Sequence, residues 1–130
     1  MKKILLIRHA HSNYIKDPNN DFTRSISNKG FLQSKILGLK FSKIGFFVQL
    51  FYCSSSNRTI QTYKTINSNL DTKVDVHLSD NLYNNTTKEI LNLISFTSDN
   101  IYSIAFIAHN PDLYNIISGI QKRSNSNIKK

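Results

Sequence analysis

The chain has 130 residues, of which 39% are hydrophobic, and its formal net charge is +9. This length predicts a single domain over residues 1–121, which buries roughly two-thirds of its unfolded surface, followed by a basic mobile tail over residues 122–130. The lone cysteine, Cys53, excludes an internal disulfide. No transmembrane run and no leader-like segment stand before the first predicted strand, which favours a cytoplasmic protein. The charge favours anionic partners, although a bias towards lysine and asparagine explains it equally well.

The first predicted strand covers residues 4–7, four consecutive aliphatic residues that suit a sheet covered on both faces. Arg8 and His9 follow it directly. In open α/β sheets, ligands bind at the carboxyl ends of the strands, so this position is a candidate binding site. Residues 12–28 form a long polar loop, and loops of this length are usually functional or disordered.

The rest of the chain alternates helices and strands. Apolar residues at helical spacing and capping residues predict helices over 28–42 (capped by Asn28, stopped by Gly45), from 57 onward, over 86–96 and over 110–120. Aromatic and β-branched residues predict strands over 46–53, 74–78 and 102–108. The alternation predicts a three-layer α/β/α fold with a mostly parallel central sheet.

Three basic side chains follow predicted strands. His9 and His109 come directly after the first and last strands, and Arg58 lies where the second strand passes into a helix, a junction that favours anions. If the strands are parallel, all three project from one edge of the sheet. No Cys and His spacing typical of a metal site is present.

These motifs resemble the histidine phosphatase superfamily, which includes the phosphoglycerate mutases. The Arg-His-Gly signature, the Ser-to-Arg block and the Gly-His-Asn-Pro block of that family are similar to Arg8-His9-Ala10, Ser54–Arg58 and Ala108–Leu113. The chain is most similar to the short SixA-like phosphohistidine phosphatases in Arg8–Ser12, Asp17-Pro18, Asp21-Phe22, Arg24 and Leu82-Tyr83.

The resemblance implies a phosphoglycerate mutase-like fold, shortened at the C-terminus, and a phosphatase that needs neither metal nor cofactor. It implies that His9 is the nucleophile and becomes phosphorylated, and that His109 donates to the phosphoryl oxygens. Arg8, Arg24 and Arg58 would bind these oxygens, because guanidinium groups form paired, charge-assisted hydrogen bonds with phosphate.

The other polar residues have more modest expected roles. Asp80 is the remaining candidate for a general acid in the segment where many relatives carry one, and Ser12 matches a Ser or Thr of the phosphate loop. His11 is expected at the rim of the site and His77 on an exposed strand. Asp17 and Asp21 either orient Arg24 or hold the turns of the loop.

The leading expected substrate is phosphohistidine in a protein. The alternatives are a small phosphomonoester or, for a protein without activity, phosphate binding alone; a nucleic-acid partner is disfavoured because basic and aromatic residues are not interleaved, and a membrane partner is not expected. The phosphate pocket is predicted to gather the arginines, both histidines and the amino end of the helix after Ser56, with no carboxylate among them. Such a pocket would capture phosphate, sulfate, vanadate or tungstate.

Overall fold

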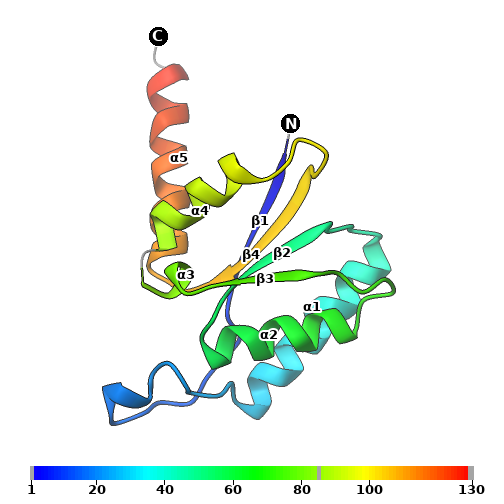
Figure 1. Ribbon diagram of the computed structural model, residues 1–130, viewed down its shortest axis with the longest axis vertical. Coiled ribbons are helices and arrows are strands. Elements are labelled where there is room, and N and C mark those ends of the chain that lie inside the picture. Colours follow the sequence, from blue (N-terminus) through cyan, green and yellow to red (C-terminus); the bar gives the residue numbers. More distant parts are fainter. Residues whose placement is uncertain (1, 85, 129–130) are drawn as a thin grey trace.

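A central sheet of four strands organises the molecule. The computed structural model describes residues 2–84 and 86–128, and side chains only as far as residue 120. The strands are β1 (Lys3–Arg8), β2 (Leu50–Ser54), β3 (Val76–Ser79) and β4 (Ser103–Ala108). They lie in the order β1-β4-β2-β3 with parallel pairing throughout (Figure 1). The carboxyl ends of all four strands therefore share one edge of the sheet, and the predicted α/β architecture is confirmed.

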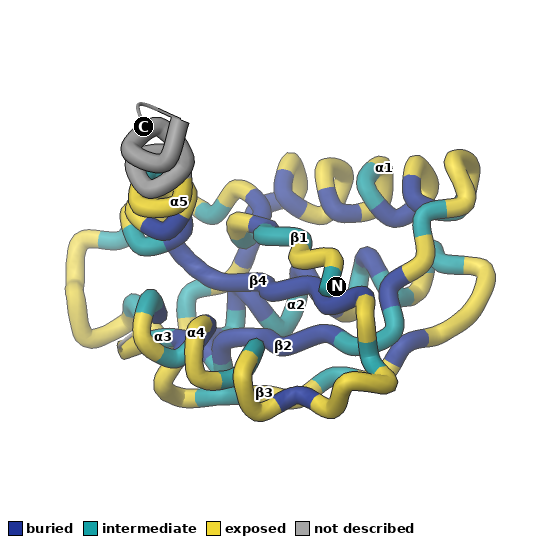
Figure 2. Tube along the Cα trace, turned by 90° about the horizontal axis from the view of Figure 1, so that it is seen from above, coloured by how far each residue is buried: buried dark blue, intermediate teal, exposed yellow. Residues whose placement is uncertain are grey.

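Helices cover both faces of this sheet (Figures 1 and 2). One face packs against α1 (Asn28–Ile44) and α2 (Asn57–Ser68), and the other against α3 (Asn81–Asn84), α4 (Thr86–Phe96) and α5 (Asp112–Ile128). The strands alternate accordingly, since successive side chains point to opposite faces: Ala105 and Ile107 face α1 and α2, whereas Ile104 and Phe106 face the other layer. Among the described residues, no helix is both long enough and apolar enough to cross a membrane.

Helix α1 packs through three small residues as well as through Phe41 and Leu37. Gly30, Ser34 and Gly38 are buried, and a Cβ atom added to Gly38 would lie 2.6 Å from the carbonyl oxygen of Ile66 in α2. The two helices therefore approach too closely for larger side chains. The apolar residues whose spacing predicted this helix mostly face solvent, and those that do are Phe31, Leu32, Ile36 and Leu39.

Several predicted boundaries differ from the structure. The cap of α1 is Ser27, whose Oγ accepts a hydrogen bond from the Gly30 N–H at 3.1 Å, and β2 begins at Leu50 because the preceding segment forms no ladder. The short helix α3 was not predicted. Helix α5 runs on to Ile128, so residues 122–128 are helical where a tail was predicted, and residues 129–130 lie outside the described part.

Candidate active site

A cavity of about 640 Å³ lies at the carboxyl edge of the sheet. It brings together residues from β1, the loop after it, α1, α2 and the segment after β4. The lining residues are Arg8, His9, Ala10, His11, Ser12, Asp21, Arg24, Gln33, Arg58, His109 and Asn110. Every residue predicted to bind the phosphoryl group is among them, although they come from distant parts of the chain.

His9 extends from the end of β1 and its ring has a defined tautomer. Its Nδ1 lies 2.8 Å from the carbonyl oxygen of Ala10. A carbonyl oxygen can only accept, so Nδ1 carries the hydrogen and Nε2 keeps its lone pair. Burial lowers the pKa of His9; the bond to Ala10 opposes this, and the charges of the cavity arginines, led by Arg58, lower the pKa further. The ring is therefore neutral at pH 7, as a nucleophile must be.

His109 is held between Arg58 and Ser54. Its Nδ1 lies 3.3 Å from Nη2 of Arg58, which can only donate, so Nε2 carries the hydrogen and donates to the Ser54 Oγ at 2.9 Å. Burial and then the Arg58 charge lower the pKa of His109 to about 4. The rings of His9 and His109 are 5.4 Å apart. Both nitrogens of His109 are occupied, so the predicted donation to a phosphoryl oxygen is not seen in this state.

The prediction that no carboxylate lies among the arginines is wrong. The Asp21 carboxylate lies between two arginines: its Oδ1 is 3.0 Å from Nη2 of Arg24, and its Oδ2 is 3.2 Å from Nη2 of Arg58. Arg58 also donates through Nη1 to the backbone carbonyl of Asp21 at 2.6 Å. Asp21 reaches the arginines because the long loop folds back over α2, where the Asn57 N–H donates to the carbonyl of Phe22. Asp21 thus already occupies part of the anion-binding face of two arginines.

The arginines nevertheless keep unused donors. The Nε atoms of Arg24 and Arg58 are buried and have no hydrogen-bond partner among the described residues. Arg58 is only 5% exposed, whereas Arg8 is exposed at the cavity mouth. Buried N–H groups without a partner are costly.

Tyr83 fixes the carboxylate of Asp21, and the sequence did not indicate this role. Its hydroxyl donates to Oδ2 of Asp21 at 2.6 Å, and its ring meets Phe22 edge to face with centroids 5.0 Å apart. Burial raises the pKa of Asp21, but the Tyr83 bond and the arginine charges outweigh it and leave the pKa below its ordinary value. Asp21 therefore stays ionised at neutral pH.

Ser54 and Gln33 were also missed. Ser54 is fully buried and orients His109, but its place in a serine cluster before a helix indicated only capping. Gln33 accepts from the His11 N–H at 3.0 Å and lines the cavity beside it. No sequence signal marked Gln33, because its partner lies on another element.

Other predicted residues lie elsewhere. Asp80, the candidate general acid, does not line the cavity and accepts a hydrogen bond from Ser55 at 2.5 Å. The amino end of α2 contributes only Arg58 to the cavity. Asp17 caps the 3-10 helix Pro18–Asn20 by accepting from the Asn19 N–H, as expected for a turn residue. His77 is exposed on β3 and Cys53 is buried, as predicted.

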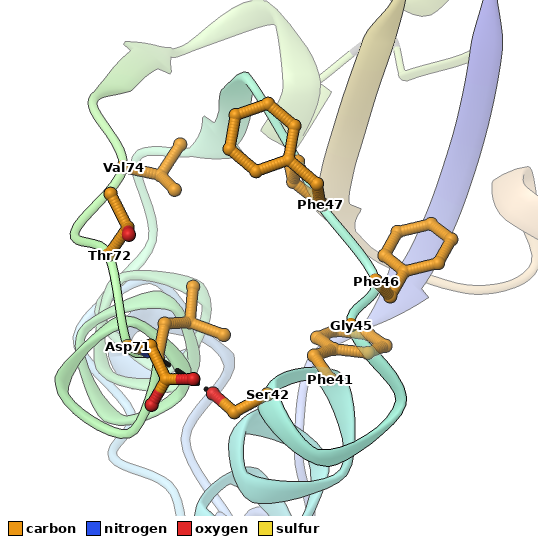
Figure 3. Close-up of a pocket in the computed structure, with 10 residues that line it drawn as sticks. Phe41, Ser42, Gly45, Phe46, Phe47, Asp71, Thr72 and Val74 are labelled. Carbon is orange, nitrogen blue, oxygen red and sulfur yellow. Dashed lines mark hydrogen bonds between the residues drawn. The ribbon is translucent and has the colours of Figure 1, made fainter.

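A second, smaller cavity of about 180 Å³ lies at the opposite edge of the sheet (Figure 3). Its lining comes from the end of α1 and from the segments that lead into β2 and β3, and it includes Phe41, Phe46 and Val74. It is mostly apolar, with Ser42 accepting a hydrogen bond from the Asp71 N–H. It contains none of the residues predicted to act on a phosphoryl group.

Solved structures share the fold of this chain. The SixA protein of Agrobacterium tumefaciens, assigned as a phosphohistidine phosphatase, superposes with a TM-score of 0.81 at 22% identity, covering 89% of this chain and 74% of that one. The assigned SixA of Nakamurella multipartitia gives a TM-score of 0.73 at 21% identity, covering 88% and 63%. A SixA structure in complex with tungstate gives 0.76 at 16% identity, covering 88% and 74%.

Sequence comparison leads to the family. An uncharacterised chloroplastic protein of Arabidopsis thaliana is 26% identical over 118 residues, covering 84% of this chain and 54% of that protein, so the chain spans about half the length of this curated relative. The family described as the histidine phosphatase superfamily, branch 1, matches residues 4–86, which include His9, Arg24 and Arg58. The matched region is more than half of the chain, and the protein therefore belongs to the histidine phosphatase superfamily.

Proposed function

We propose that the protein is a metal-independent phosphatase that forms a covalent phosphohistidine at His9. The observation that carries the proposal is the free Nε2 lone pair of His9 inside a cavity that three arginines line. Phosphoryl transfer is catalysed mainly by positioning and by stabilising charge on the three non-bridging oxygens. Arg8, Arg24 and Arg58 supply that positive charge from the chain itself.

The reaction has two steps. In the first, the Nε2 lone pair of His9 forms a bond to phosphorus while the P–N bond of the substrate phosphohistidine breaks, and the substrate imidazole, already protonated on its other nitrogen, leaves as a neutral ring. In the second, water attacks phosphorus, the P–N bond to His9 breaks, and inorganic phosphate leaves. The hydrogen bond from Nδ1 to the Ala10 carbonyl stabilises the ring while it carries the phosphoryl group.

The leading substrate is phosphohistidine in a protein. Two acidic residues near the site are candidates for a general acid. Asp80 lies outside the cavity, and Asp21 is ionised and bound to two arginines. Neither is therefore placed to protonate a poor leaving group. An imidazole whose second nitrogen is protonated leaves more easily than an alkoxide. This favours a phosphoramidate over a sugar phosphate. The tungstate held by a SixA protein of the same fold further supports an oxyanion site.

The test is hydrolysis of an aryl phosphate and of phosphohistidine by the wild type and by His9→Ala, both in the presence of chelator. We expect the wild type to be active and to yield an acid-labile phosphoenzyme, and His9→Ala to be inactive. His77→Ala is the matched control, because it removes an exposed imidazole remote from the cavity. Activity that survives His9→Ala would refute the mechanism, and a sugar phosphate turned over much faster than phosphohistidine would refute the substrate.

A further inference from the structure

The outward face of α1 carries apolar side chains that no described part of the chain covers. Leu32, Ile36 and Leu39 follow one another at helical spacing and are 58%, 45% and 49% exposed. In Figure 2 the tube of α1 is dark blue only at intervals, and the buried residues of the helix are Gly30, Ser34, Gly38 and Phe41. A core-packing role is therefore excluded for these three side chains.

Lysines surround these apolar side chains. Lys29, Lys35, Lys40 and Lys43 are all exposed, and α1 contains no acidic residue among its 17 positions. On a helical wheel, Lys43 lies in line with the three aliphatic residues and the other lysines flank them. We call this surface, made of the three aliphatic and four lysine side chains, the α1 face.

The amino-terminal part of α1, which carries one end of the α1 face, borders the catalytic cavity. Gln33, next to Leu32 in the helix, lines that cavity and accepts from the His11 N–H at 3.0 Å. The first turn of α1 also contacts the catalytic loop, because the Ser27 N–H donates to the His11 carbonyl at 2.8 Å. A macromolecule that places a phosphoryl group in the cavity would therefore lie within reach of α1.

We infer that the α1 face is the docking surface for the phosphorylated protein substrate, and that this substrate presents an acidic surface with apolar side chains at its centre. The inference rests on the proposed function. A phosphoryl group and the ring that carries it are common to all phosphohistidine proteins, so selection among these proteins needs contacts beyond the cavity. An acidic partner complements the four lysines, and apolar contacts with the three aliphatic side chains supply affinity.

The same charges disfavour the other occupants of such a face. A second copy would bring four lysines against four lysines and would be repelled. A nucleic acid would pair with the lysines but would leave the aliphatic centre without an apolar partner. The apolar groove between β1, α4 and α5 lacks continuity with the cavity and is not part of the inference.

The test uses a helical protein of acidic surface, phosphorylated on one exposed histidine, and free phosphohistidine as the small substrate. The variants are Lys35→Glu, which reverses one charge, and Leu39→Asn, which removes apolar surface without changing charge. Lys88→Glu on α4 is the matched control, because it reverses the charge of another exposed lysine on the other side of the sheet. We expect the first two variants to lower kcat/KM for the phosphoprotein by about fivefold or more, with free phosphohistidine and Lys88→Glu unaffected.

The outcomes separate docking from catalysis. If the wild type hydrolyses the phosphoprotein and both variants match it, the docking surface is refuted and the proposed function stands. If the wild type hydrolyses neither substrate, the proposed function fails. The docking surface is then tested by calorimetric binding of the unphosphorylated acidic protein. Weaker binding by both variants than by the wild type supports the docking surface, and equal binding or no binding refutes it. Binding of the wild type to phosphatidylserine vesicles but not to the acidic protein would also refute it, in favour of a membrane surface.

Discussion

Replacing Asp21 by Asn should strengthen the binding of phosphate analogues. The Asp21 carboxylate pairs with Arg24 and Arg58 at 3.0 and 3.2 Å, and these are the guanidinium groups that a phosphoryl group would need. Binding of an anion must therefore displace the carboxylate or share the arginines with it. Asn keeps the size and an acceptor oxygen for the Tyr83 hydroxyl, but it removes the competing charge.

The size of the effect follows from the exposure of Asp21. Its side chain is 34% exposed, and a pair of this kind contributes about 0.2–1 kcal/mol. Two pairs together give about 0.4–2 kcal/mol, which corresponds to about 2-fold to 30-fold tighter binding. Because the pKa of Asp21 is lowered, the carboxylate stays ionised from pH 5 to 8, and the gain should be constant over that range.

The assay is competitive inhibition of aryl phosphate hydrolysis by vanadate, or direct calorimetry with tungstate if activity is low. Asp17→Asn is the matched control, since it removes the same charge from the same loop and keeps the cap on the Asn19 N–H. Weaker vanadate binding by Asp21→Asn would refute the reasoning. In that case the carboxylate organises the two arginines for the anion rather than competing with it.

Three further predictions concern stability and positioning. The pKa of His109 is about 4 in the native state and about 6.5 in the unfolded state, so the unfolded state binds more protons as the pH falls. The free energy of unfolding, measured with urea, should therefore fall by about 3 kcal/mol from this group between pH 7 and pH 4. The variant His109→Asn should show a weaker dependence of this free energy on pH. Gly38→Ala should lower the free energy of unfolding by about 1–3 kcal/mol, because the added Cβ meets the α2 backbone. Gly119→Ala is the control, because open space surrounds Gly119. If the two variants were equally stable, the close contact between α1 and α2 would be contradicted. Ser54→Ala should lower kcat/KM about tenfold, because it leaves the His109 N–H without its acceptor. The control Ser55→Ala should leave kcat/KM unchanged, because Ser55 donates to Asp80 outside the cavity. Equal kcat/KM values for the two variants would exclude a positioning role for Ser54.

The sequence by itself determined the parallel α/β arrangement and the edge at which the site forms. Residues 4–7 and 104–108 are apolar without alternation, which predicts strands buried on both faces. Arg8 and His9 follow the first run and His109 follows the second. Strand β4 is buried throughout, whereas β1 lies at the sheet edge and is partly exposed. The presence and type of each of these elements depend on local spacing, which a linear sequence displays directly, whereas the residue that caps α1 was predicted one position too late. The convergence of His9, Arg58 and His109 then follows from the parallel topology alone.

Tertiary structure alone decided how the site is charged and which face of α1 is free. The pairing of Asp21 with Arg58 depends on how a long loop folds back over α2, and contacts between residues so distant in sequence leave no local pattern. The spacing of the apolar residues of α1 predicted a helix, but it did not indicate which side of that helix is buried. Close approaches of Gly30 to the His11 carbonyl and of Gly38 to the Ile66 carbonyl of α2 fixed which side faces inward, and Leu32, Ile36 and Leu39 face solvent.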